Sequence, residues 1–231
     1  MILLVGAGRL GQLVLEEFKS SEIIGTNTTD QEGFLKLDLS KDSLSSLEYN
    51  TFIFCVPPSS VSTELWLKRL EEISDKKIIL ISSTGVYGEN KGEVNEDTSP
   101  EPNTENGEKL IAIESLLQEF KKSFVIRPSG LFSIDLHPGK YLAGKSDLSN
   151  GKDPVNLISR EDVAKVVKYI YENESPRLIN LAHPSHPEKA TYYRSYCERN
   201  DLELPNFKNE SGNMKVVNSK YKIIEKYSDL P

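Results

Sequence analysis

The sequence has few cysteines, no long apolar run and no recognisable targeting segment. Its two cysteines, Cys55 and Cys197, lie far apart and outside any Cys-x-x-Cys or Cys/His pattern, so we expect reduced thiols and no metal site. No apolar stretch approaches the ~20 residues that a membrane-spanning helix needs. The N-terminus lacks the basic segment and the small-residue cleavage site of a signal peptide. These absences predict a soluble, cytoplasmic protein without a membrane partner.

Basic residues are also in deficit. The 231 residues include 28 lysines and arginines against 35 aspartates and glutamates, which gives a formal net charge of −7. Proteins that bind DNA, RNA or anionic lipid need a basic surface, so this balance argues against a nucleic-acid partner. The length predicts one domain, or one domain with a small additional lobe.

Short apolar runs alternate with longer amphipathic segments, a pattern typical of a doubly wound parallel α/β sheet. The predicted strands cover residues 2–5, 22–26, 34–37, 51–56, 77–81, 123–127 and 178–181. The predicted helices cover residues 10–18, 61–73, 103 or 104 to 120, 159–171 and 188–199, with a short helix at 220–226. Residues 131–153 are irregular and rich in glycine, which favours loops over a functional face.

The run Gly6-Ala7-Gly8-Arg9-Leu10-Gly11 directly follows the first strand and opens the first helix. Gly6 allows a tight turn, Gly8 lets the backbone approach a pyrophosphate, and Gly11 lets the helix pack against the strand. The positive end of the helix favours the phosphate charge. The motif and its context predict an NAD(P)-binding Rossmann fold.

The end of the second strand favours NADP over NAD as the cofactor. An NAD site normally has an acidic residue there for the ribose hydroxyls, whereas this chain has Asn27 and no carboxylate before Asp30. Arg9 is either a partner for a 2′-phosphate or a solvated surface cation. Asp38, followed by Leu39 after the third strand, either accepts a hydrogen bond from the adenine amino group or stabilises a turn.

A second motif, Ser82-Ser83-Thr84-Gly85-Val86-Tyr87-Gly88, follows the strand at 77–81, at the edge where open α/β sheets gather ligands. Together with the glycine motif it resembles the extended short-chain dehydrogenase/reductase superfamily, the nucleotide-sugar epimerase and dehydratase group, whose SSxxVYG signature it matches. Three further segments agree with this resemblance: Val56-Pro57-Pro58, residues 126–132 with Arg127 and Pro128, and residues 156–163. The resemblance covers residues 1–182 and leaves 183–231 as a small C-terminal substrate lobe, packed with loops from 131–157.

The resemblance implies hydride transfer between a nicotinamide dinucleotide and a sugar-like or other carbonyl substrate, by an epimerase, dehydratase or reductase. It implies that Ser83 is the catalytic serine, which stabilises the charge that develops on the substrate oxygen. The alternative is that Ser82, Ser83 and Thr84 satisfy backbone groups at a strand end. The segments Val56-Pro57-Pro58 and Arg127-Pro128 would line the cofactor, and the helix that ends near residue 120 would form a homodimer.

The Tyr-x-x-x-Lys pair of the family, in which lysine activates tyrosine as a base, is missing. Aligned on Gly107 and Glu114, the chain has Asn106 at the tyrosine position and Leu110 at the lysine position; aligned on Lys109, it has Glu105 at the tyrosine position. The departure resembles the atypical, YeeZ-like members of the superfamily. The remaining candidates for the proton carrier are Tyr87, Tyr141, His137 and Glu105. The loss of the pair also favours an alternative, a non-catalytic NAD(P)-binding redox sensor or regulatory protein.

Overall fold

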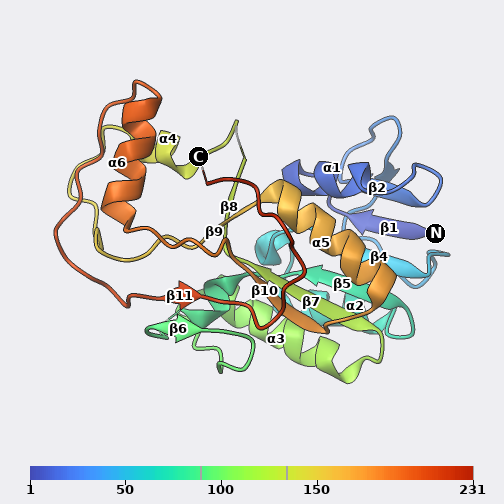
Figure 1. Cartoon of the computed structure of the whole chain (residues 1–231). Helices are drawn as coiled ribbons and strands as arrows, with labels where there is room; N and C mark the ends of the chain where they lie inside the picture. The colour runs from blue at the N-terminus through green and yellow to red at the C-terminus, as the bar shows by residue number, and fades with distance from the viewer. Residues whose placement is uncertain (89, 134, 231) are drawn as a thin grey trace.

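The computed structural model describes residues 1–88, 90–133 and 135–230; Glu89 lies outside the described residues, as do Ile134 and Pro231 of the predicted lobe segments. A seven-stranded sheet forms the centre of the molecule (Figure 1), with the order β10-β7-β5-β4-β1-β2-β3 and parallel pairing throughout. Its strands are β1 (Ile2–Val5), β2 (Ile23–Asn27), β3 (Leu35–Lys36), β4 (Thr51–Phe54), β5 (Lys77–Ile81), β7 (Ser123–Pro128) and β10 (Leu178–Leu181). The predicted doubly wound α/β fold is confirmed.

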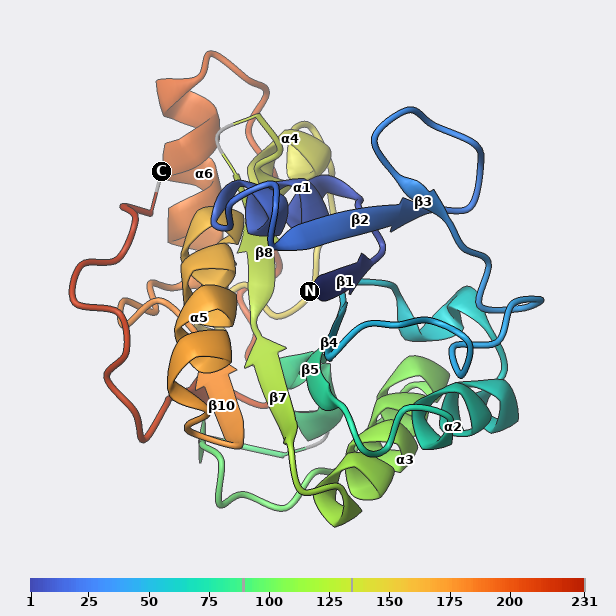
Figure 2. The same ribbon diagram turned by 90° about the vertical axis from the view of Figure 1, so that its right-hand side faces the viewer.

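Helices cover both faces of the sheet (Figure 2). On one face lie α1 (Arg9–Glu16) and α5 (Arg160–Asn173), and on the other lie α2 (Thr63–Glu71) and α3 (Glu105–Glu119). The central strand β1 is apolar at every position because successive side chains point to opposite faces and both faces are covered. In β1, Ile2 and Leu4 join the core under α1 and α5, while Leu3 and Val5 join the core under α2 and α3.

The stretch predicted as loops contains short elements that the periodicity did not indicate. Strand β8 (Gly130–Phe132) pairs with β9 (Leu157–Ser159), and the short helix α4 (Pro138–Leu142) packs against α6 (Lys189–Arg199). These elements stand beside the C-terminal edge of the main sheet (Figure 1). Their shared apolar cluster consists of Phe132, Val155, Leu157, Tyr192 and Tyr193. The division of the chain at residue 182 stays a prediction.

The predicted helix at 220–226 is wrong. After β11 (Val216–Val217), which pairs with β6 (Glu93–Val94), the chain runs as a strap along α5. The Lys220 backbone N–H donates to Glu96, and Ile223 and Ile224 pack on the core beneath α5. These long-range contacts hold the backbone extended and outweigh the local helical pattern. None of the helices in the described residues is long and apolar enough to cross a membrane.

Candidate functional site

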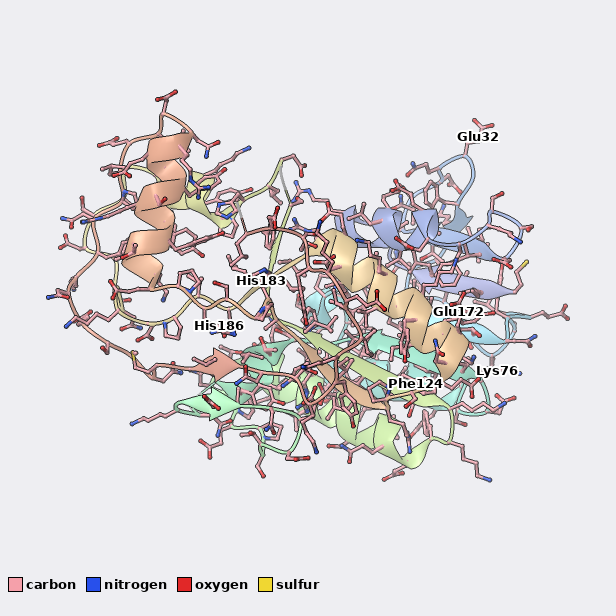
Figure 3. The ribbon with its side chains drawn as sticks, in the orientation of Figure 1. Glu32, Lys76, Phe124, Glu172, His183 and His186 are labelled. Atoms are coloured by element: carbon pink, nitrogen blue, oxygen red, sulfur yellow. The ribbon has the colours of Figure 1, made fainter. Side chains whose placement is uncertain are left out.

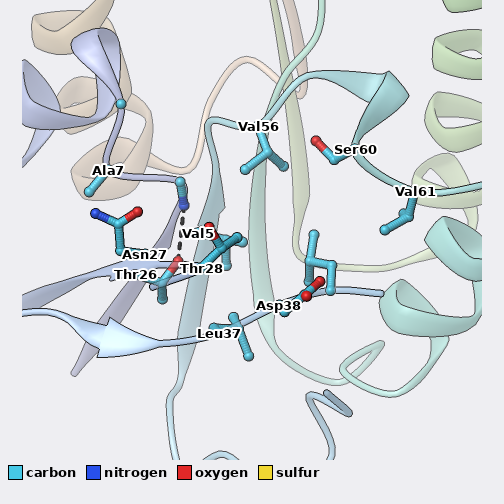
Figure 4. Close-up of a pocket in the computed structure, with 13 residues that line it drawn as sticks. Val5, Ala7, Thr26, Asn27, Thr28, Leu37, Asp38, Val56, Ser60 and Val61 are labelled. Carbon is cyan, nitrogen blue, oxygen red and sulfur yellow. Dashed lines mark hydrogen bonds between the residues drawn. The ribbon is translucent and has the colours of Figure 1, made fainter. Parts of the chain in front are cut away.

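The turn between β1 and α1 requires glycine at two positions. Gly6 has φ +97°, and a Cβ there would lie 2.4 Å from Val56 Cγ1. A Cβ on Gly11 would lie 2.2 Å from the Gly6 carbonyl oxygen, so only glycine lets α1 start this close to β1. The Gly6 N–H donates to Thr26 Oγ1 at 3.1 Å, which fixes the turn to β2 (Figure 4).

Gly8 has a different environment. It is the N-cap residue of α1, and a Cβ there would meet nothing within 4 Å. No side chain caps the helix, so N–H groups of the first turn remain available to an anion. Arg9 and Leu10 begin the helix at the same opening, with Arg9 exposed. No neighbouring atom of the protein therefore requires glycine at position 8. The open space beside uncapped N–H groups fits the close approach of a pyrophosphate.

A cavity of about 160 Å³ joins this turn to the ends of the neighbouring strands (Figure 4). Its lining includes predicted cofactor residues from four separate segments: Gly6, Gly8, Asn27, Asp38, Leu39 and Val56. Pro57 is the N-cap of the 3-10 helix η1 (Pro58–Ser60), and Ser60 and Val61 close the cavity on that side. The structure therefore brings together segments that the sequence separates by up to 50 residues.

Two polar residues at the strand ends shape the cavity. Asn27 Nδ2 donates to Gln31 Oε1 at 2.6 Å. The Asp38 carboxylate accepts hydrogen bonds from the Ser40 hydroxyl, the Ser40 backbone N–H and Lys41 Nζ. These bonds, led by that of the Ser40 hydroxyl, lower the pKa of Asp38 to about 2, so Asp38 is an anion at neutral pH. An adjoining cavity includes Lys36 and Lys41 in its lining.

Ser83 lies at the C-terminal end of β5 and caps the 3-10 helix η2 (Thr84–Tyr87). Its Oγ accepts a hydrogen bond from the Gly85 N–H at 2.9 Å. That bond fixes the side chain and leaves the hydroxyl proton available, because the bond uses a lone pair of the oxygen. Ser83 is half-buried, so a ligand at this edge of the sheet can reach it.

Tyr87 and Arg127 lie in a buried network instead of the cavity. Arg127 forms a salt bridge with Glu114 of α3, both side chains being at most 4% exposed, and its Nη1 donates to the Tyr87 hydroxyl at 2.7 Å. The Tyr87 oxygen lies 2.7 Å from the Asn95 carbonyl oxygen and 3.1 Å from Asn180 Oδ1. Burial raises the pKa of Tyr87. Their predicted roles in catalysis and cofactor binding therefore gain no support from this placement.

The network also includes the first residue of the SSxxVYG motif, to which Tyr87 belongs. The hydroxyl of Ser82, the neighbour of Ser83, donates to Glu114. Pro128 ends β7 directly after Arg127. The buried pair thus supports the strand ends on which a ligand would lie.

Helix α3 places the residues of the two possible alignments of the missing Tyr-x-x-x-Lys pair in different surroundings. Leu110 is buried in a cluster that includes Val86 and Tyr87 of η2, whereas Lys109 Nζ lies 3.3 Å from the Val61 carbonyl oxygen, next to η1. Leu110 therefore faces η2, with Asn106 one turn earlier on the same helix face, and both alignments stay predictions. The Thr104 side chain caps the helix by accepting a hydrogen bond from the Gly107 N–H. Of the two predicted starts, residues 103 and 104, the structure has the second as the cap.

The other candidate proton carriers are dispersed. His137 is 1% exposed in the lobe, where its Nδ1 accepts from the Gly139 N–H and its Nε2 lies 2.8 Å from the Tyr192 hydroxyl oxygen. Burial lowers the pKa of His137 to about 4. Tyr141 on α4 is 58% exposed, and Glu105 begins α3. Within the described part of the chain, no group of three or more His, Cys, Asp and Glu side chains could hold a metal ion.

The fold and the glycine turn define the class by architecture: a Rossmann-like α/β protein with a seven-stranded parallel sheet. No protein-family model matches the chain. Among curated proteins, it is 31% identical over 171 residues to protein YeeZ of Escherichia coli (strain K12), a match that covers 69% of this chain and 62% of YeeZ. The chain thus matches less than two thirds of the length of this relative. The predicted resemblance to the YeeZ-like, atypical members is confirmed.

Solved structures show the same fold at low sequence identity. UDP-glucuronic acid 4-epimerase from Bacillus cereus, solved in complex with NAD, superposes with a TM-score of 0.76 at 16% identity, covering 95% of this chain and 87% of the epimerase. A dTDP-4-dehydrorhamnose reductase from Clostridium acetobutylicum gives a TM-score of 0.74 at 17% identity, covering 94% and 89% of the two chains. These likenesses extend the confirmed fold over nearly the whole chain, including the lobe.

Proposed function

We propose that the chain binds a nicotinamide dinucleotide in the cavity beside Gly8 and takes part in hydride transfer with a sugar-like carbonyl substrate. The observation that carries the proposal is the continuity of that cavity from the open glycine turn to the ends of β2 and β3. The structural neighbours support it, since one was solved with NAD and another is a reductase of a nucleotide-linked keto sugar. Equilibrium binding of NADPH and NADH, followed by quenching of the single tryptophan, tests it; absence of binding contradicts it.

The preferred dinucleotide in this proposal is NADP. Asn27 stands where an acidic side chain would repel a 2′-phosphate, and Lys36 and Lys41 are in the lining of the adjoining cavity. Arg9 at the start of α1 adds a further cation. We expect Asn27→Asp to shift the ratio of NADPH to NADH affinity toward NADH, because it introduces a carboxylate beside the ribose. An unchanged ratio would show that the 2′-position lies elsewhere.

The substrate oxygen is proposed to bind at Ser83. Its hydroxyl is oriented by Gly85 and retains its proton for donation. Turnover of NADPH with nucleotide-linked keto sugars, ketones and aldehydes tests this role, and Ser83→Ala should lower kcat while leaving dinucleotide affinity unchanged. Activity that survives the change would remove Ser83 from the mechanism.

A second candidate function is a non-catalytic sensor of the dinucleotide redox state. The observation that favours it is Leu110, a buried apolar side chain that stands at the lysine position when the chain is aligned on Gly107 and Glu114. Tight dinucleotide binding without turnover of any substrate would support the sensor. The homodimer and the cytoplasmic location stay predictions, and light scattering of the purified protein tests the first of them.

A further inference from the structure

Asn106 and Ser83 lie on two elements that pack together at the C-terminal edge of the sheet. A Cβ on Gly107 of α3 would lie 3.6 Å from the Gly85 carbonyl oxygen of η2, and the Gly85 N–H in turn binds Ser83 Oγ. Leu110 faces η2 and is buried. Asn106 is one turn earlier on the same helix face, toward the sheet edge, and is exposed. Its amide makes no hydrogen bond to another described residue, so it remains available to a ligand.

The titratable side chains around this pair are engaged elsewhere or point away. Lys109 donates to the Val61 carbonyl oxygen, and Lys215 donates to the carbonyl oxygens of Tyr87 and Gly88. Glu105 precedes Asn106 by one residue, which turns its side chain about 100° around the helix. The same geometry carries Glu108 about 200° from Asn106.

One imidazole lies at the same sheet edge, at the end of β10. Figure 3 shows His183 and His186 where the lobe joins the sheet. The His183 Nδ1 accepts a hydrogen bond from the Ser185 N–H, and its ring meets Tyr227 of the strap edge-on at 5.5 Å. Ser83 and Asn106 thus offer a ligand between α3 and η2 two neutral groups, a hydroxyl and a primary amide.

We propose that Asn106 replaces the missing tyrosine as a neutral hydrogen-bond donor, and that with Ser83 it binds the carbonyl oxygen of a nucleotide-linked keto sugar. This inference rests on the proposed function and narrows it to carbonyl reduction, with water as the proton source. Two neutral donors stabilise negative charge on oxygen, but they accept no proton. Oxidation of a sugar hydroxyl, with which an epimerase or dehydratase begins, must then give its proton to hydroxide, which is scarce at neutral pH, so the oxidation is slow there without a side-chain base.

The proposed reduction balances without a side-chain acid. The reduced dinucleotide supplies a hydride. The carbonyl carbon gains a C–H bond as the C4–H bond of the dihydronicotinamide breaks, and the π electrons of the carbonyl pass to its oxygen. The hydroxyl of Ser83 and the amide of Asn106 hold that oxygen while it takes a proton from water, which leaves hydroxide in solution. The products are the sugar alcohol and the oxidised dinucleotide.

The first test measures binding. The probes are dTDP-4-dehydrorhamnose, a nucleotide-linked ketone, and dTDP-rhamnose, its alcohol. The ketone is titrated with oxidised dinucleotide bound and the alcohol with reduced dinucleotide bound, so that neither probe meets the dinucleotide with which it could react. We expect Asn106→Ala and the isosteric Asn106→Asp, which lacks the amide donor, to weaken ketone binding by up to about tenfold, the effect of one hydrogen bond to a neutral carbonyl oxygen. Alcohol affinity and dinucleotide affinity should change less than twofold. Gln118→Ala, an exposed amide on the same helix, is the matched control.

The second test uses pH and direction of reaction. With reduced dinucleotide, kcat should stay level between about pH 5 and 8, the range in which a histidine would titrate. Oxidation of dTDP-rhamnose by oxidised dinucleotide should be slow near neutral pH and rise about tenfold per pH unit, because hydroxide takes the proton in the reverse direction. Ketone binding unaffected by Asn106→Asp, no binding of the ketone, no reduction of the bound ketone, an inflection in that pH range, or an oxidation rate that does not rise with pH would each overturn the inference. Dinucleotide affinity, measured separately, decides the proposed function independently of these results.

Discussion

The buried pair of Glu114 and Arg127 gives the sharpest prediction about stability. Both side chains are at most 4% exposed, and Arg127 Nε lies 3.2 and 3.1 Å from the two Glu114 carboxylate oxygens. Glu114→Gln keeps the shape and removes the negative charge, so the guanidinium of Arg127 stays buried without a counter-ion. Breaking such a pair typically costs 3–5 kcal/mol. Since glutamine retains one oxygen acceptor, we expect a loss of about 3 kcal/mol in the free energy of unfolding.

Urea unfolding followed by circular dichroism measures this loss. In a thermal melt of a chain of this size, the same loss should lower the midpoint temperature by about 6–12 °C. Glu119→Gln, an exposed residue of the same helix, should change stability by less than about 0.5 kcal/mol. The double variant Glu114→Leu with Arg127→Met should be more stable than Glu114→Leu alone, because an apolar pair leaves no buried charge. A loss below about 1 kcal/mol for Glu114→Gln would refute the reasoning.

Three further predictions follow from the glycine turn and the lobe. Gly8→Ala should leave the thermal midpoint unchanged, because a Cβ there meets nothing within 4 Å, yet weaken dinucleotide binding at least about tenfold by blocking the phosphate; unchanged affinity in titration would contradict the site. Gly11→Ala should lower the midpoint sharply, since its Cβ would lie 2.2 Å from the Gly6 carbonyl oxygen, and a stable variant in a thermal melt would show that the turn can relax. His137 has a folded pKa of about 4 against an ordinary value of 6.5, so the unfolded chain binds more protons and stability should fall by up to about 3 kcal/mol as pH drops from 6.5 to 4. His137→Asn, which retains an N-cap side chain, should flatten that pH dependence of urea unfolding.

The parts of the site that depend on backbone geometry were predictable from the sequence. A Cβ at Gly6 or Gly11 would lie under 2.5 Å from a neighbouring atom. Since every other residue type has a Cβ, the glycine pattern by itself predicts the turn. The strands and main helices were predictable for a similar reason: apolar runs and helical periodicity record burial on one or two faces. The position of Ser83 followed from its place at a strand end.

Features set by long-range partners were not predictable. Tyr87 belongs to a recognisable motif, but its hydroxyl is engaged by Asn180, 93 residues away along the chain. The local sequence around His137 is that of a loop and gives no hydrogen-bond partner for the imidazole. Its partner Tyr192 is 55 residues away along the chain. The strap after Val217 has a local pattern typical of a helix, and its extended path depends on Glu96, over 120 residues earlier. A signal for these contacts would need information on residue pairs, which one sequence does not contain.

Asn106 and Leu110, which stand at the positions of the family's tyrosine and lysine when the chain is aligned on Gly107 and Glu114, are physically coupled. A lysine at position 110 would place its ammonium among Val86, Tyr87 and Val217, where no phenolate or carboxylate at position 106 would compensate its desolvation. Once the tyrosine is absent, an apolar residue at 110 is the more stable choice, and it lets β11 pack against η2. It follows that restoring tyrosine alone, as Asn106→Tyr, should not restore an activated phenol: its pKa should stay near 10 in a spectrophotometric titration, because the cation that would lower it is missing. A phenol that ionises near neutral pH in that variant would show that Lys109 or Lys215 can turn toward position 106, and would supply the side-chain base that the neutral pair lacks.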